Sequence, residues 1–442
     1  MISWRRCGLV AAGFCLLLLG GCGGWFGEAD EPPLPGERVS VLLYEGDLAP
    51  DPRISDQAVA LPPPYRNASW TQVGGGSLHA VGHVAGPTKI TRPAWRTSFG
   101  SGAGRYRPLM TAPVVARDRV YAMDSRYRVS AYGTAKGRKV WQTGLTVPKR
   151  DGEAFGGGIA YELGRIYIST GFGTVAAIDA EDGAVLWTKT VPGPVRAAPL
   201  VMDGQVFVVT VDNQLVALDA ATGDRQWRHA GFAETTALLG SAAPAGLDGT
   251  VIVPYSSGEV FALRAVNGRP TWSDNLAAVR RVDAASSLAD IRALPVTDGN
   301  LVYAVSHSGR MVAIDLRTGA RAWERNIGGV RTPWIAGNWI FVLNNEAQVV
   351  CLSRRDGRVR WIVQLDKYEK PKQLEDPIHW IGPMAVGGQL LVIGGHGRGL
   401  AIDASDGGIL ETFKVPDEIM AAAVADGTLY LQTEDADLLA YR

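Results

Sequence analysis

Beyond residue 88 the chain consists of short runs in which apolar and polar residues alternate, separated by turn residues. Runs of about four to eight such residues, rich in β-branched and aromatic side chains, predict half-buried β-strands. No stretch keeps the 3.6-residue period that is typical of an amphipathic helix. The pattern therefore predicts an all-β protein.

The strands belong to a repeating unit. The unit is marked by a tryptophan at seven places and by Glu411 at the eighth, and a glycine stands four residues before each of the last seven marks. The step between marks averages about 45 residues, which is the length of a propeller blade. The tryptophans are Trp95, Trp141, Trp187, Trp227, Trp272, Trp323 and Trp361. We expect them to pack between repeats rather than to form a ligand cage.

Each unit has the same internal order. In Ala177–Trp187 an apolar strand ends at Asp179, a turn follows with a glycine, and a second strand ends at the tryptophan. Two further strands precede these, as in Leu301–Val305. Four antiparallel strands per unit predict a propeller blade. An array of β-sandwiches is the rival, but it would not keep one turn and one tryptophan constant.

The ends of the repeat region predict how the ring closes. The last unit, Ala421–Arg442, lacks a fourth strand, and Thr91–Thr97 is a strand without three of its own before it. If the strand of Trp95 completes the last unit, no sheet edge is left exposed. We therefore predict an eight-bladed β-propeller over residues 89–442, closed by an N-terminal strand.

The first residues are typical of a targeting sequence. Residues 1–21 carry two arginines and then an apolar run that is too short to span a membrane, which is typical of a signal peptide. Leu19-Gly20-Gly21-Cys22 resembles a bacterial lipobox, so Cys22 is the predicted lipidation site, with an ordinary signal peptide as the alternative. Gly23 in place of Asp implies sorting to the outer membrane.

Residues 22–88 keep no period and contain proline and glycine clusters, so we expect an extended, semi-rigid tether. His79 and His83 are spaced like metal ligands. With no acidic or thiol partner near them, they are interpreted as surface histidines.

Composition excludes a nucleic-acid-binding protein and a disulfide-rich scaffold. The 44 Lys and Arg residues equal the 44 Asp and Glu residues, which gives no charge footprint for nucleic acid. Three of the four cysteines lie within the first 22 residues, which excludes a disulfide framework. Cys351, on a predicted strand, is expected to be a buried thiol.

The repeated Ala-[Ile/Leu]-Asp-x-x-[Thr/Asp]-Gly-x-x-x-Trp resembles the quinoprotein-type (PQQ-like) propeller repeat. Together with the lipobox and eight units, it resembles the BamB family of outer-membrane assembly lipoproteins, most closely through Ser287–Trp361. The resemblance implies a non-catalytic scaffold without cofactor or metal, anchored by lipid at the periplasmic face of the outer membrane. It also implies docking on the POTRA domains of BamA, to aid the folding and insertion of outer-membrane protein precursors.

The family's partner contact uses two neighbouring interblade connections. Here they are 229–243, which carries Leu238 and Leu239, and 274–294, which carries Asp290 and Arg292. Leu238 and Asp290 fit the family pattern, whereas Leu239 stands in place of an arginine and Arg292 in place of an acid. Asp290 has an equal alternative reading as a cap of its own turn.

Two other functions stay open. A periplasmic PQQ-like propeller could serve a different protein partner. A quinoprotein dehydrogenase relative would need an adjacent pair of cysteines and a calcium site, and only Cys351 stands in the propeller. The repeated aspartates 179, 219, 315 and 403 precede turns and are expected to bond them, not to act in catalysis.

Overall fold

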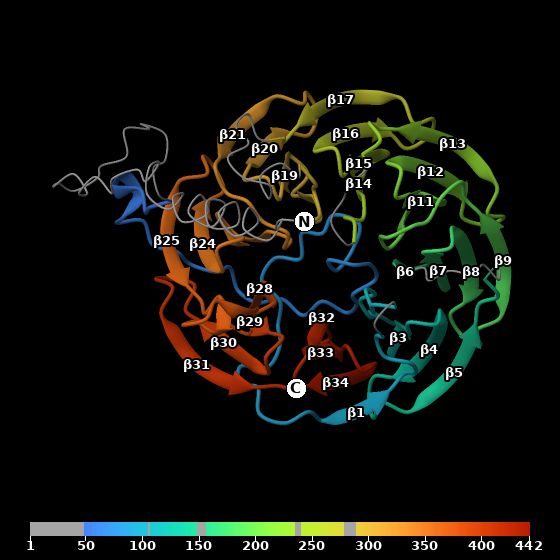
Figure 1. Ribbon diagram of the computed structural model, residues 1–442, viewed down its shortest axis with the longest axis horizontal. Coiled ribbons are helices and arrows are strands. Elements are labelled where there is room, and N and C mark those ends of the chain that lie inside the picture. Colours follow the sequence, from blue (N-terminus) through green and yellow to red (C-terminus); the bar gives the residue numbers. More distant parts are fainter. Residues whose placement is uncertain (1–47, 105–106, 148–155, 235–239, 278–288) are drawn as a thin grey trace, which may run out of the picture. The chain divides into compact units, whose positions relative to one another are not determined.

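The computed structural model describes residues 48–104, 107–147, 156–234, 240–277 and 289–442. In these ranges, eight four-stranded antiparallel sheets follow one another around a ring (Figure 1). The predicted eight-bladed propeller is confirmed. Of the described residues, none form a helix long and apolar enough to cross a membrane.

The first four blades have their strands in chain order, from the centre of the ring outward. Blade 1 is β2 (Val114–Ala116), β3 (Arg119–Met123), β4 (Arg128–Gly133) and β5 (Lys139–Gly144). Blade 2 is β6 (Gly157–Glu162), β7 (Arg165–Thr170), β8 (Thr174–Asp179) and β9 (Val185–Thr190). Blade 3 is β10 (Leu200–Met202), β11 (Gln205–Val209), β12 (Gln214–Asp219) and β13 (Arg225–Ala230). Blade 4 is β14 (Ala245–Leu247), β15 (Thr250–Pro254), β16 (Glu259–Arg264) and β17 (Pro270–Asn275).

The next three blades repeat this order. Blade 5 is β18 (Val296–Thr297), β19 (Leu301–Val305), β20 (Met311–Asp315) and β21 (Arg321–Arg325). Blade 6 is β22 (Trp334–Ala336), β23 (Trp339–Leu343), β24 (Gln348–Ser353) and β25 (Val359–Gln364). Blade 7 is β28 (Trp380–Val386), β29 (Gln389–Gly394), β30 (Arg398–Ile402) and β31 (Ile409–Lys414). A hairpin that the sequence did not predict, β26 (Tyr368–Lys370) with β27 (Glu375–Pro377), stands between blades 6 and 7.

Blade 8 closes the ring with strands from distant parts of the chain. It consists of β32 (Ile419–Ala425), β33 (Thr428–Thr433), β34 (Asp437–Tyr441) and β1 (Trp95–Ser98). Trp95 pairs with Ala440 and Ser98 with Asp437, so β1 is the outermost strand (Figure 1). The predicted seam is therefore confirmed.

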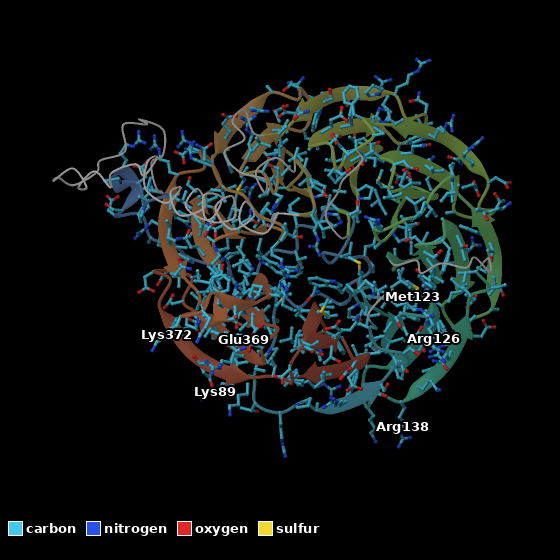
Figure 2. The ribbon with its side chains drawn as sticks, viewed as in Figure 1. Lys89, Met123, Arg126, Arg138, Glu369 and Lys372 are labelled. Carbon is cyan, nitrogen blue, oxygen red and sulfur yellow. The ribbon has the colours of Figure 1, made fainter. Side chains whose placement is uncertain are left out.

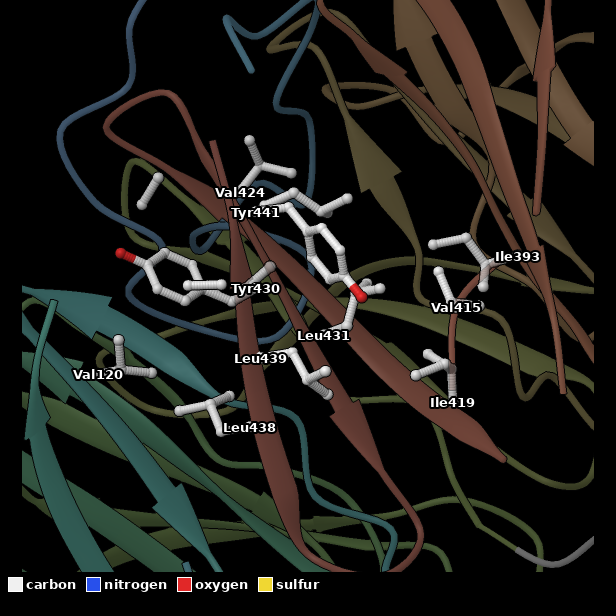
Figure 3. Close-up of a cluster of buried hydrophobic side chains, with 14 of the residues drawn as sticks. Val120, Ile393, Val415, Ile419, Val424, Tyr430, Leu431, Leu438, Leu439 and Tyr441 are labelled. Atoms are coloured by element: carbon white, nitrogen blue, oxygen red, sulfur yellow. The ribbon is translucent and has the colours of Figure 1, made fainter. Parts of the chain in front are cut away.

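Apolar faces of neighbouring blades pack against each other to form the core. At the seam, side chains from blades 7, 8 and 1 make one buried cluster. Figure 3 shows, between Val120 of blade 1 and Ile393 of blade 7, the blade 8 side chains of Tyr430, Leu431, Leu438, Leu439 and Tyr441. Charged side chains such as Lys89 and Arg138 point outward at the edge of the ring (Figure 2).

The repeated tryptophans join each blade to the next. Every one of the seven donates its Nε1–H, at 2.7–3.1 Å, to a carbonyl in the last turn of the following blade. That turn contains the glycine that stands four residues before the next repeat mark. This glycine has positive φ and lies against the tryptophan, and a Cβ added to it would come within 2.4–3.0 Å of the tryptophan side chain. Gly137 meets Trp95 in this way, and Gly407 meets Trp361. The expected packing role of the tryptophans is confirmed.

Glu411 takes the tryptophan's place on β31, the strand that would face the same turn in blade 8. No tight turn joins β34 to β1, because these strands are far apart in the sequence. The eighth tryptophan is therefore missing where its glycine partner is also missing.

Residues 65–87, which we call the inner belt, differ from the predicted tether. They run once around the axis of the ring along its innermost strands, with the 3-10 turn Pro52–Ile54 (η1) and the chain after it leading in along blade 6 (Figure 1). Residues 48–442 form one compact unit. The expected boundary between tether and propeller at residue 88 is thus wrong for residues 48–88, while residues 1–47 lie outside the described ranges.

The belt contacts all eight blades in ring order. Its hydrogen bonds to blades 8, 1, 2 and 3 come from Asn67, Trp70, Thr71 and Gln72. Those to blades 4, 5, 6 and 7 come from Ser77, Leu78, Gly82 and Val84. Most use backbone atoms, which explains why the sequence of this segment shows no repeated side-chain pattern.

The two histidines of the belt are buried, so the interpretation as surface residues is wrong. His79 Nδ1 lies 2.8 Å from the Pro295 carbonyl, and burial lowers the pKa of His79 to about 4. His83 bridges the Pro62 carbonyl, through Nδ1, and the Gly388 N–H, through Nε2. Each imidazole therefore satisfies backbone groups inside the ring.

Candidate partner-binding face

Two long interblade connections, between β13 and β14 and between β17 and β18, carry the predicted partner-binding residues. Leu238 and Leu239 lie outside the described residues, as do residues 278–288 of the second connection. The structure places Asp290 and Arg292 at the inner end of that second connection, just before Pro295 and β18.

The two connections meet where they reach the axis of the ring. Gly240 of the first has a positive φ of 97°, and a Cβ there would come within 3.2 Å of Arg292 Nε. Beneath them Ala242, Ala243 and Leu294 pack with Ala197 and with Val73 of the belt. The predicted adjacency of the connections is therefore observed, and they rest on a packed base.

Asp290 and Arg292 differ in exposure. Asp290 is only 3% exposed, and its carbonyl accepts the His307 N–H at 2.9 Å. The backbone of Asp290 is thus bonded to the β19–β20 turn, and the interpretation of its side chain as a cap of its own turn stays a prediction. Arg292 is half-buried. Burial lowers the pKa of Arg292, and the charge of Asp290 opposes that shift.

Phe232 is a surface residue of the first connection that the sequence analysis missed. Its side chain is 72% exposed, although its backbone is fixed at both ends. The N–H donates to Glu259 Oε2 at 2.8 Å, and the carbonyl accepts from Asn213 Nδ2 at 2.7 Å. A single exposed apolar side chain is ordinary on a protein surface, so Phe232 is a candidate contact because of its fixed place on this connection. Its position two residues after β13 was the available signal.

Cys351 and the repeated aspartates do not form a catalytic or metal-binding group. Cys351 is buried and reduced, and burial raises the pKa of its thiol. Asp179, Asp219, Asp315 and Asp403 each accept backbone N–H groups of the turn that follows, as expected. Within the described ranges, no three His, Cys, Asp or Glu side chains are grouped so that they could hold a metal ion. The residues present do not fit a quinone with its metal.

Comparison with known proteins agrees with this architecture. The family model described as "Outer membrane protein assembly factor BamB" matches residues 125–363, more than half of the chain. The chain belongs to the BamB family. The match extends from β4 to β25, so it includes both connections discussed above.

Individual proteins resemble the chain at moderate identity. BamB of Yersinia pestis is 29% identical over 315 residues, which cover 70% of this chain and 78% of that protein. An uncharacterized protein of Rickettsia conorii is 30% identical over 273 residues, and the chain spans 65% of the length of that relative. The crystal structure of BamB from Moraxella catarrhalis shares the fold, with a TM-score of 0.66, 21% identity, and coverage of 78% of this chain and 99% of that one.

Proposed function

We propose that the protein is a non-catalytic scaffold of the outer-membrane β-barrel assembly machinery, which docks on the POTRA domains of BamA and aids the folding and insertion of barrel precursors. The observation that carries the proposal is the family match through β4–β25, which contains both interblade connections. The fixed, exposed Phe232 and the packed base under Gly240 and Arg292 support a rigid docking surface.

Binding to the purified POTRA domains of the cognate BamA, measured by calorimetry, tests the proposal. Leu238→Glu places a charge in the apolar part of the surface and should weaken binding by several kcal/mol, on the order of 2–4, while the fold is kept. Phe232→Ser should weaken binding in the same direction. Leu163, 87% exposed on a turn of blade 2, supplies the control Leu163→Glu, which should bind as the wild type does.

Two results would contradict docking. The first is no binding by the wild-type protein. The second is equal binding by wild type, Leu238→Glu and Phe232→Ser. Either result favours the alternative, a periplasmic PQQ-like propeller with a different partner, which pull-down from detergent-solubilised membranes would then identify.

We further propose that Cys22 is lipidated and anchors the protein at the periplasmic face of the outer membrane. The lipobox Leu19–Cys22 and the Gly23 after it support this proposal. Cys22→Ala should abolish acyl labelling and leave unprocessed precursor, whereas Cys15→Ala, in the same apolar run, should be labelled normally. An unlabelled wild-type protein that fractionates free of the membrane would contradict the anchor.

The proposal assigns no chemistry to the ring. Quinoprotein dehydrogenases are the less favoured alternative, and the single buried Cys351 does not match their pair of cysteines. Equilibrium dialysis of the purified protein against pyrroloquinoline quinone with Ca²⁺ should recover no bound quinone. Stoichiometric retention of the quinone would favour the dehydrogenase alternative.

A further inference from the structure

Two arginines at the inner ends of the interblade connections differ from three half-buried arginines that are paired with carboxylates. Arg128, Arg321 and Arg354 each hold a carboxylate oxygen at 2.7 Å. Arg292 and Arg331 are also half-buried, but in the described part of the chain neither forms an ion pair or a side-chain hydrogen bond. Removing a guanidinium from water without a hydrogen-bond acceptor costs free energy. An unpaired guanidinium of this kind therefore indicates a position where a ligand or partner supplies the acceptor.

The two charges lie close enough to repel each other. Burial, and after it the positive charge of Arg292, lower the pKa of Arg331 to about 10. His379 lies just before β28, in the connection that follows the β26–β27 hairpin. Burial is the main cause that lowers the pKa of His379, and the positive charges of Arg331 and Arg292 lower it further. Arg331 and His379, from two successive connections, therefore line one cavity and no carboxylate acts on the pKa of either, whereas Arg292 has the charge of Asp290 beside it.

A cavity of about 200 Å³ opens beside these groups, between blades 6 and 7. Arg331, His379 and Lys367 line it together with the amide of Asn345, and no Asp or Glu is among its lining residues. Lys367 is already paired with Glu346 at 2.6 Å. Arg331 is thus the cation of the cavity wall that lacks a partner among the described residues.

The other walls are apolar and include Leu343, Ile378 and the buried Trp380. A volume of about 200 Å³ is below the usual size of a site for a cofactor or drug-sized ligand, about 300–1,000 Å³. It suits one or two side chains. A carboxylate with an apolar neighbour matches the cavity in charge, size and polarity.

We propose that Arg331 and His379 form a carboxylate-binding site on the face of the interblade connections, and that its ligand is an acidic side chain, next to an apolar one, on the protein that docks there. The occupant rests on the proposed docking function, since the site continues the surface that carries Arg292 and Gly240. An Arg–carboxylate pair would be charge-assisted and would satisfy the guanidinium that the free protein leaves unpaired.

Stability and binding change in opposite directions if this is correct. Arg331→Gln removes an unpaired buried charge, so the melting temperature of the free variant should rise above that of wild type. The same variant should bind the cognate POTRA domains at least tenfold more weakly, and the salt dependence of its binding should decrease. Arg355→Gln, at an exposed arginine of the same blade, is the matched control and should change neither property.

A second probe does not depend on the identity of the partner. The acetylated dipeptide amide Leu-Glu should raise the melting temperature of wild type more than Leu-Gln does, and it should not raise that of the double variant Arg331→Gln, His379→Gln. If wild type does not bind POTRA domains but responds to Leu-Glu, the docking function fails and the carboxylate site stands.

Three results would overturn the site. The first is a melting temperature of Arg331→Gln at or below that of the Arg355→Gln control, which would make Arg331 a structural residue. The second is equal stabilisation of wild type and double variant by Leu-Glu. The third is stabilisation of wild type by inorganic phosphate as strong as that by the peptide, which would assign the cavity to a free anion.

Discussion

The blades and the inner belt hold the same ring together in different ways. Between blades, one contact recurs: a tryptophan on the outer strand meets a glycine turn of the next blade, as Trp187 meets Gly223. The belt makes a different contact at every blade, mostly through its backbone. A repeated side-chain contact leaves a period in the sequence, whereas backbone hydrogen bonds leave none. The comparison shows why one region could be predicted and the other could not.

The largest loss of stability should come from removing the belt together with a strand of the blades. Deleting residues 1–100 removes the belt and β1, which exposes the edge of β34. Deleting residues 1–88 removes the belt and the chain before it, including η1, but keeps β1. The loss of Trp70 costs on the order of 3–5 kcal/mol by itself. Deleting residues 1–47 should leave stability unchanged.

Thermal and urea unfolding of the three truncations gives the order. We expect residues 101–442 to be the least stable and residues 48–442 the most stable. Equal stability of residues 89–442 and 48–442 would show that the belt contributes nothing to the ring, and equal stability of residues 101–442 and 89–442 would refute the seam.

Removing one tryptophan–glycine contact between blades should cause the next largest loss of stability. Trp187→Ala removes a buried indole and its hydrogen bond to Ala220, which should lower the free energy of unfolding by about 3–5 kcal/mol. Gly223→Val should be destabilising as well, because φ is 75° and a Cβ would come within 2.6 Å of the indole. Urea titration measures both, with Gly204→Ala, at a positive-φ turn without close neighbours, as a control for backbone strain alone.

The belt should respond to acid through His79. Its pKa is about 4 in the folded protein, against the ordinary 6.5, so protonation favours the unfolded state. The stability that the neutral imidazole preserves is fully present above pH 6.5 and is lost as the pH falls toward 4, by about 3 kcal/mol in total.

His79→Asn keeps a donor for the Pro295 carbonyl and tolerates the positive φ of 55°, but it does not titrate. The difference in unfolding free energy between wild type and His79→Asn should therefore grow in favour of the variant below pH 6.5. A difference that is constant from pH 7.5 to 4.5 would contradict the buried, neutral histidine.

The smallest effect is expected where the blade contact is absent. Glu411→Trp restores the tryptophan of the repeat on β31, but blade 8 offers no glycine turn to receive it. Its effect on unfolding should lie within about 0.5 kcal/mol, as for an ordinary surface substitution. A stabilisation as large as the loss in Trp187→Ala would mean that the indole does not need the turn.

The sequence predicted the ring because each prediction used side chains that the fold repeats. The glycine-to-tryptophan spacing located the strands, and the unmatched strand of Trp95 located the seam. The spacing placed each glycine in a turn and each tryptophan on a strand, and it predicted packing between repeats. It did not show which glycine each tryptophan meets, because spacing along the chain does not show which repeat a residue touches. His79 and His83 were misplaced for a related reason: their partners are the carbonyls of Pro295 and Pro62, which have no sequence signature.

The candidate site was predicted only in part. The position of Arg292 before Pro295 followed from the family pattern, but Arg331 and His379 did not, since a lone basic residue before a strand is common. Their distinguishing property is a missing partner, which can be recognised only when the surrounding carboxylates have been located. The β26–β27 hairpin that borders the cavity also interrupts the period, and its strands are too short to be predicted.

The circular path of the belt has a consequence for the order of assembly. Asn67 bonds to Val424, 357 positions later, and Val84 bonds to Ala385. The belt precedes every blade in the chain, yet its contacts cannot all form until the last blade has formed. Its closure therefore comes late in folding and depends on all eight blades at once. A defect in any one of them would leave the belt partly unbound and accessible to proteases, so this segment would act as a check that the ring is complete.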